Sequence, residues 1–144
     1  MFLGACGADP TSQPAADNDN NAEATVSNKI TGHVSEWEVD VSAGKAEAGT
    51  VIFAIANFGT IQHEFLVTKT TYEPGKIPVG ANNRFDEEDP GIEVIDEIAE
   101  WPIDEAKVLK IDLEPGIYEL LCNIEGHYAN GMHRTFEVVA KSME

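Results

Sequence analysis

The amino-acid sequence predicts an all-β protein, an antiparallel Greek-key β-sandwich of seven to eight strands. Short segments alternate apolar and polar residues, as half-buried strands do, and turn-forming Gly, Pro and Asn residues separate them at close spacing. Hardly any segment has the periodicity of an amphipathic helix. With 144 residues, the chain is long enough to bury one hydrophobic core without disulfides.

The predicted strands differ in their apolar patterns. Residues 51–57 are apolar almost throughout, whereas residues 107–113 alternate between the two faces of a half-buried strand. Residues 70–91 contain most of the Pro-Gly and Asn turn signals, so we expect an irregular excursion there. Residues 92–98 fit either a strand or a short helical turn. The remaining strands are expected at two short segments between Ile30 and Val41 and at 63–68, 117–122 and 133–140.

The first 25 residues differ in composition from the rest of the chain. Leu-Gly-Ala-Cys at residues 3–6 resembles a bacterial lipobox, in which Cys6 would carry a lipid anchor, although a signal peptide needs a longer apolar stretch before it. The alternative is an inert Cys in a disordered tail. Residues 7–25 contain four acids and no base, so we expect a disordered acidic tether over 1–25 and a folded domain over 26–144.

Three potential metal ligands lie in one loop between the last two predicted strands. Cys122, His127 and Met132 are five residues apart and offer a thiolate, an imidazole and a thioether. This soft set suits copper better than calcium, magnesium or manganese. A trigonal copper centre needs a second imidazole, which His63 offers at the start of a predicted strand. Cys-x4-His alone could indicate zinc, but structural zinc sites have closely paired ligands, and the C-x-x-C-H haem motif does not occur.

Two motifs together carry a resemblance to a known family. The first is N-x-G-x-x-x-H-x-F at residues 57–65, and the second is P-G-x-Y-x-x-x-C-x4-H-x4-M at residues 115–132. The pair resembles the blue copper proteins, or cupredoxins, and the loop spacing is most similar to the rusticyanin, sulfocyanin and auracyanin branch. The resemblance covers residues 30 to 140 and implies the same Greek-key sandwich.

The resemblance also implies a single type 1 copper ion that cycles between Cu(I) and Cu(II). His63, Cys122 and His127 would be its equatorial ligands, and Met132 its weak axial ligand. Many family members have Asn after the first ligand His, and its side chain ties the two ligand loops together. This chain has Glu64 instead, so the resemblance predicts neither the connection between the two loops nor the reduction potential. His127 would lie near the surface as the electron's exit, within a docking rim of Ile124, Gly126, Tyr128 and Ala129.

We therefore predict a monomeric, mononuclear electron carrier outside the cytoplasm, in the periplasm or at the cell surface. It would exchange single electrons with redox partner proteins such as a cytochrome or an oxidase. The alternative is a copper carrier or storage protein that uses the same ligands without redox turnover. An enzyme is not expected, because copper oxidases and nitrite reductases add His-x-His pairs, and the four His of this chain form none.

The chain is strongly acidic, with 26 acids against 9 bases and a formal charge of −17. This charge argues against nucleic-acid binding and favours a cationic partner. Ten of the acids lie between Asp86 and Glu105, a segment without Lys or Arg. The segment is either a solvated acidic face or a docking patch that steers a basic redox partner. No apolar run is long enough to span a membrane, so we expect membrane contact only through a lipid on Cys6.

Overall fold

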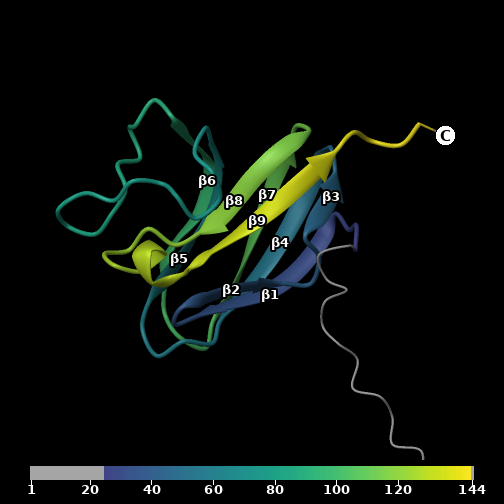
Figure 1. Cartoon of the computed structure of the whole chain (residues 1–144). Coiled ribbons are helices and arrows are strands. Elements are labelled where there is room, and N and C mark those ends of the chain that lie inside the picture. The colour runs from purple at the N-terminus through teal and green to yellow at the C-terminus, as the bar shows by residue number, and fades with distance from the viewer. Residues whose placement is uncertain (1–24, 144) are drawn as a thin grey trace, which may run out of the picture.

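The computed structural model describes residues 25–143, which form two β-sheets packed face to face (Figure 1). No helix in this part of the chain is long and apolar enough to cross a membrane. The described elements are β1 (Lys29–Ser35), β2 (Glu38–Val41), β3 (Lys45–Glu47), β4 (Gly49–Asn57), β5 (His63–Thr70), β6 (Ile92–Trp101), β7 (Ala106–Leu113), β8 (Gly116–Leu121), the 3-10 helix η2 (Tyr128–Asn130) and β9 (His133–Val139).

The strand order is β2-β1-β4-β7 in one sheet and β3-β9-β8-β5-β6 in the other. The predicted all-β sandwich is confirmed, with two differences in detail. The described residues contain nine strands, because the three-residue β3 is too short for an alternating pattern to reveal. The sheets are mixed, because β1 pairs parallel with β4 and β3 pairs parallel with β9. Residues 92–98, whose pattern fitted either a strand or a short helical turn, belong to strand β6.

The main hydrophobic core lies between the two sheets. Phe53 of β4 packs against Phe65 of β5 and Phe136 of β9 across the sandwich, with ring centroids 5.4 Å apart in both pairs. All three rings are fully buried, and burial of such a side chain contributes about 2 kcal/mol. Val51, Phe53 and Ile55, every second residue of β4, point into this core, as strand geometry requires. Cys122 and Met132 belong to the same core.

The excursion at residues 71–91 builds a second apolar cluster on the other face of the β5–β8 pair. Leu66 and Leu121 neighbour core residues in sequence, so their side chains point away from the main core. Ile77 and Phe85 of the excursion cover them, and Tyr128 joins from the loop between β8 and β9. Figure 1 shows the excursion, in teal, on the same side of the molecule as that loop. The predicted irregular backbone is confirmed, and two of its side chains are buried.

Candidate metal centre

The candidate ligands come from two segments that are distant in the sequence. His63 is the first residue of β5, and Cys122 directly follows β8. His127 precedes η2, and Met132 directly precedes β9. The two segments are brought together because β5 and β8 are neighbours in the second sheet. This pairing places the start of β5 beside the end of β8.

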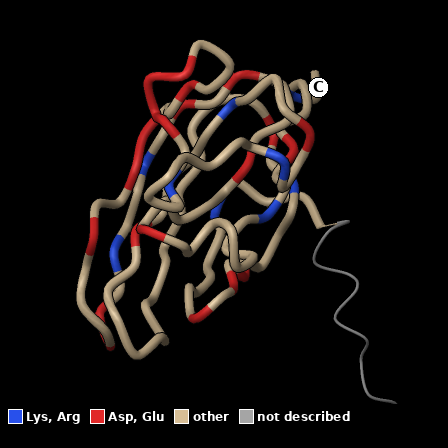
Figure 2. Tube along the Cα trace, turned by 60° about the vertical axis from the view of Figure 1, so that its left-hand side comes forward, with Lys and Arg blue, Asp and Glu red and all other residues tan. Residues whose placement is uncertain are grey.

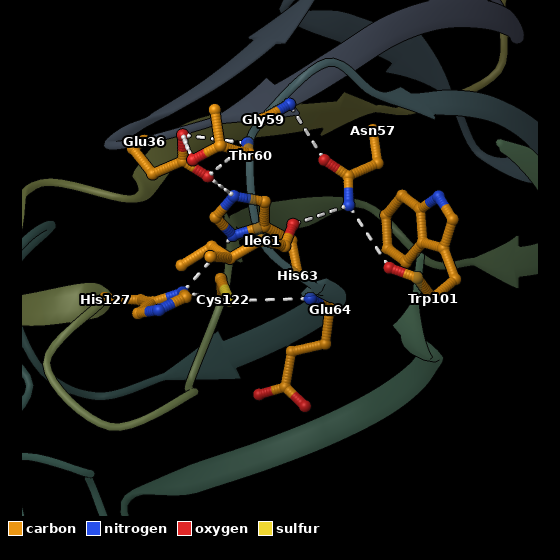
Figure 3. A network of polar contacts seen from close by, with 10 residues as sticks. All are labelled: Glu36, Asn57, Gly59, Thr60, Ile61, His63, Glu64, Trp101, Cys122 and His127. Atoms are coloured by element: carbon orange, nitrogen blue, oxygen red, sulfur yellow. Dashed lines mark hydrogen bonds and ion pairs between the residues drawn. The ribbon is translucent and has the colours of Figure 1, made fainter. Parts of the chain in front are cut away.

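Three of the four candidate ligands converge on one point. One ligand atom each of His63, Cys122 and His127 lies within 4.8 Å of the other two. Nδ1 of His63 is 3.2 Å from Nδ1 of His127, and Sγ of Cys122 is 3.3 Å from the same His127 nitrogen (Figure 3). His63 and Cys122 are fully buried, and His127 is only 4% exposed. A buried thiol and two imidazoles that converge in this way fit a copper ion, which accepts both donor types.

Met132 lies beside these residues through the backbone. Its N–H donates to the carbonyl of His127 at 3.2 Å, and its own carbonyl accepts the N–H of Cys122 at 3.1 Å. The Met132 side chain is fully buried in the main core together with Cys122. Its role as the axial ligand stays a prediction.

The loop that carries Cys122, His127 and Met132 is closed by its own backbone. The N–H of His127 donates to the carbonyl of Ile124 at 2.8 Å, and that of Asn130 donates to the carbonyl of Gly126 at 3.1 Å. The one-turn helix η2 then ends at Gly131, whose φ of 113° favours glycine. These short-range bonds hold the spacing between His127 and Met132, and the buried Asn123 side chain ties the start of the loop to Phe85 and Glu87.

The loop before His63 is shaped by the buried side chain of Asn57 (Figure 3). Its Nδ2 donates to the carbonyls of Ile61 and Trp101, at 3.0 and 3.2 Å, and its Oδ1 accepts the N–H of Gly59 at 2.9 Å. Gly59 has no room for a side chain, because a Cβ would come within 2.7 Å of Nε2 of His63. The Asn, Gly and His of the first motif therefore form one local structure.

A carboxylate from the β1–β2 turn orients His63. Oε1 of Glu36 accepts a hydrogen bond from Nε2 of His63 at 2.7 Å, which leaves Nδ1 of that ring facing the other ligands. Glu36 also accepts bonds from the N–H and the hydroxyl of Thr60. Partial desolvation by itself would raise the pKa of Glu36, but the hydrogen bonds from His63 and Thr60 hold this pKa below its ordinary value. Metal-binding histidines commonly have such a partner, because it fixes the tautomer and the ring orientation.

An aromatic ring from the same turn contacts His127. The indole of Trp37 packs against this imidazole in a T-shaped arrangement, with ring centroids 5.0 Å apart. Burial, and then the nearby charge of His63, lower the pKa of His127. The sequence did not predict a role for Glu36 or Trp37. Neither belongs to a motif, and each reaches the site only through the folded β1–β2 hairpin.

Burial also governs the protonation of Cys122. It raises the pKa of the thiol to about 11, against weaker opposition from the backbone N–H groups of Glu64 and Ile124. The metal-free protein therefore carries the protonated thiol at neutral pH. A metal ion that binds Cys122 must displace this proton.

Glu64 joins the two segments that carry the candidate ligands, a connection that the sequence alone had not settled. Its carboxylate accepts the N–H of Asn123 at 2.8 Å, and its own N–H points at Sγ of Cys122, 3.5 Å away. Burial raises the pKa of Glu64 to about 7, and the neighbouring Glu87 adds to this effect. A carboxylate thus joins the loops here, where many blue copper proteins use the Asn amide.

The remaining predicted residues are distributed as follows. In the expected docking rim, Ala129 is exposed and Ile124 and Gly126 are half-buried, but Tyr128 is buried in the second apolar cluster and cannot form part of a surface. The acids between Asp86 and Glu105 are exposed, apart from the half-buried Asp89. Cys6 and almost all of the predicted tether lie outside the described residues.

No protein-family model and no curated protein sequence matches this chain. Solved structures do match it. Reduced auracyanin from the photosynthetic bacterium Roseiflexus castenholzii has a TM-score of 0.62 at 20% identity, over 80% of this chain and 99% of auracyanin. Rusticyanin from Thiobacillus ferrooxidans has a TM-score of 0.54 at 17% identity, over 78% and 79% of the two chains. An azurin from Methylomonas sp. strain J has a TM-score of 0.53 at 15% identity, over 77% and 97%.

At these identities the likeness establishes the fold. The chain has the fold of auracyanin, rusticyanin and azurin, and the fold that the two motifs implied is thereby confirmed.

Proposed function

We propose that this protein is a mononuclear type 1 copper electron carrier. The observation that carries the proposal is the convergence of two imidazoles and one thiol within 4.8 Å of one another at a buried site. His63, Cys122 and His127 would be the equatorial ligands, and Met132 the axial one. When bound, copper supplies a one-electron couple between Cu(I) and Cu(II).

The chain's own residues favour rapid electron exchange over chemistry on a substrate. Glu36 fixes the ring of His63, and backbone hydrogen bonds fix the loop that bears the other ligands. A site held in this way needs little rearrangement when its charge changes by one unit. The ligand side chains are also at most 4% exposed, so a substrate would have little access to the metal. This burial supports a carrier rather than an enzyme.

The alternative is a copper carrier or storage protein that uses the same ligands. A protein that hands over its metal must let an acceptor's ligands replace its own. Burial of His63 and Cys122 opposes that exchange. The same burial favours electron transfer, in which the metal stays in place.

The visible absorption spectrum distinguishes the two functions. The copper-loaded protein should show intense visible absorption after oxidation, should lose it on reduction, and should regain it over repeated cycles. A protein that stays colourless after an oxidant is added, with copper bound, would support the carrier or storage function instead.

We also propose an extracytoplasmic location and redox partner proteins that dock near His127 or at the acidic segment from Asp86 to Glu105. The exposure of nearly all the acids in that segment supports steering of a basic partner such as a cytochrome or an oxidase. The lipobox-like sequence ending at Cys6 supports a lipid anchor. Salt should slow association with a basic partner, and mass spectrometry of the native protein would detect the lipid.

A further inference from the structure

We propose that Trp37 is the residue through which the metal centre exchanges electrons with its surroundings. This inference rests on the proposed function. The candidate ligands are buried: His63, Cys122 and Met132 fully, whereas His127 is 4% exposed. Hardly any ligand surface is therefore available to an outside molecule.

Trp37 combines contact with a ligand and contact with solvent. Its indole packs against the His127 ring, with centroids 5.0 Å apart and an interplanar angle of 66°, and it is 42% exposed. A molecule that approaches the His127 side of the centre therefore meets an aromatic ring that already touches the imidazole. Two π systems in contact give a shorter and better coupled route than the same distance through solvent.

The β1–β2 turn holds this ring in place. Ser35 and Glu38 pair across the hairpin on either side of the turn. Glu36 is bonded to both Thr60 and His63, immediately before Trp37 in the chain. The turn therefore contacts both imidazole ligands, through the carboxylate of Glu36 on one and the indole of Trp37 on the other (Figure 3 shows Glu36 with His63).

Glu36 offers a second contact between a candidate ligand and the outer surface, because its side chain is 23% exposed. Its outer part is a saturated chain, however, and its carboxylate is occupied by three hydrogen-bond donors from His63 and Thr60. The aromatic route is the better conductor of the two. In the step itself, one electron passes from the reduced centre to a one-electron acceptor outside the protein, and no covalent bond is made or broken.

Replacement of Trp37 by Leu tests the proposal, because Leu still covers His127 but has no π system. The rate of oxidation by a tris-chelate cobalt(III) cation, measured by stopped flow, should fall by about tenfold, or about 1.4 kcal/mol in activation free energy. Trp37→Phe keeps an aromatic ring and should retain most of the rate. The visible spectrum and the reduction potential of both variants should equal those of the wild type.

Phe58→Leu is the matched control. Phe58 is an exposed aromatic residue that packs against His33, which is not a candidate ligand, with ring centroids 5.2 Å apart. This variant should keep the wild-type rate. A Trp37→Leu protein that reacts as fast as the wild type, or faster, would overturn the proposal. So would a slower rate that is accompanied by a changed spectrum or potential, because Trp37 would then act by shaping the site. A wild-type protein without the visible band would instead refute the proposed function.

Discussion

The two segments that supply the candidate metal ligands are held by different means. The segment before His63 depends on side chains, namely Asn57 within its loop and Glu36 from the β1–β2 turn. The loop from Cys122 to Met132 is held by its own backbone hydrogen bonds from His127 onward. Near Cys122 it is also held by the buried Asn123 side chain, which bonds to Phe85 and Glu87. It also lies between two apolar clusters, because Cys122 faces the main core and Leu121 faces the second cluster.

This difference has a physical consequence for mutation. Side-chain hydrogen bonds are lost through single substitutions, whereas backbone bonds survive most of them. The early segment should therefore be the more fragile in structure. The late loop should tolerate changes at its exposed positions, such as Asn130, but lose its chemistry when a candidate ligand is replaced.

Replacement of Cys122 by Ser should have the largest effect. The intense visible band of the oxidised copper protein should disappear, because the charge transfer requires the thiolate. Absorption of the copper-loaded protein measures this directly. Cys6→Ser, which changes the only other cysteine, should leave the band intact. A Cys122→Ser protein that remained coloured would refute the assignment of this ligand.

Replacement of Asn57 by Ala should show the fragility of the early segment. The substitution leaves three buried or half-buried backbone groups without their partner, so the free energy of unfolding should fall by about 3 kcal/mol. Denaturant unfolding of the metal-free protein measures the change.

Asn130→Ala is the corresponding test in the late loop. The exposed Asn130 donates to the carbonyl of Gly126, and its loss should cost about 0.5 kcal/mol. Equal losses in the two variants would contradict the contrast between the two segments.

Replacement of Met132 by Leu tests the axial role in the late loop. The change nearly conserves volume, so the stability cost should stay below about 1.5 kcal/mol. The visible band should persist, and the reduction potential should rise, because a weak axial donor is removed. Voltammetry of the wild type and the variant gives the comparison. An unchanged or lower potential would count against Met132 as a ligand.

Replacement of Glu64 by Gln tests the tie between the two segments through the pH dependence of stability. The pKa of Glu64 is raised from 4.5 to about 7, so the folded protein holds a proton that the unfolded chain releases within this range. The unfolding free energy of the metal-free protein should therefore contain a contribution that is present below pH 4.5 and declines as the pH rises toward 7.

The Gln side chain keeps the acceptor for Asn123 but does not titrate. The Glu64→Gln protein should therefore lose less stability between pH 5 and 7 than the wild type, when unfolding is followed at several pH values. A pH dependence identical in the two proteins would show that Glu64 does not titrate in that range.

The sequence predicted the strands whose side chains alternate regularly, and also the continuous apolar run that forms β4, but other strands were ambiguous or missed. β6 was ambiguous because its register with β5 shifts at two places, which disturbs the alternation. β3 has only three residues. The parallel pairings of β1 with β4 and β3 with β9 were not predicted, because turn signals report only on neighbours in the chain.

At the site, the sequence identified the residues that two local motifs place together, and the structure brings His63, Cys122 and His127 within reach of one ion. It did not identify Glu36 or Trp37, because a Glu-Trp pair in a turn has no distinctive pattern. Their contacts with the two imidazoles arise only when the first hairpin packs across the end of the sandwich.

The direction of β1 determines how a tethered protein presents its centre. β1 begins at Lys29, close to the first described residue, and ends at Ser35, immediately before the turn that touches both imidazoles. Its seven residues span about 23 Å. A molecule attached to a surface through its N-terminal segment would therefore hold the candidate metal centre at the far end of β1, where molecules in the space beyond that surface can reach it.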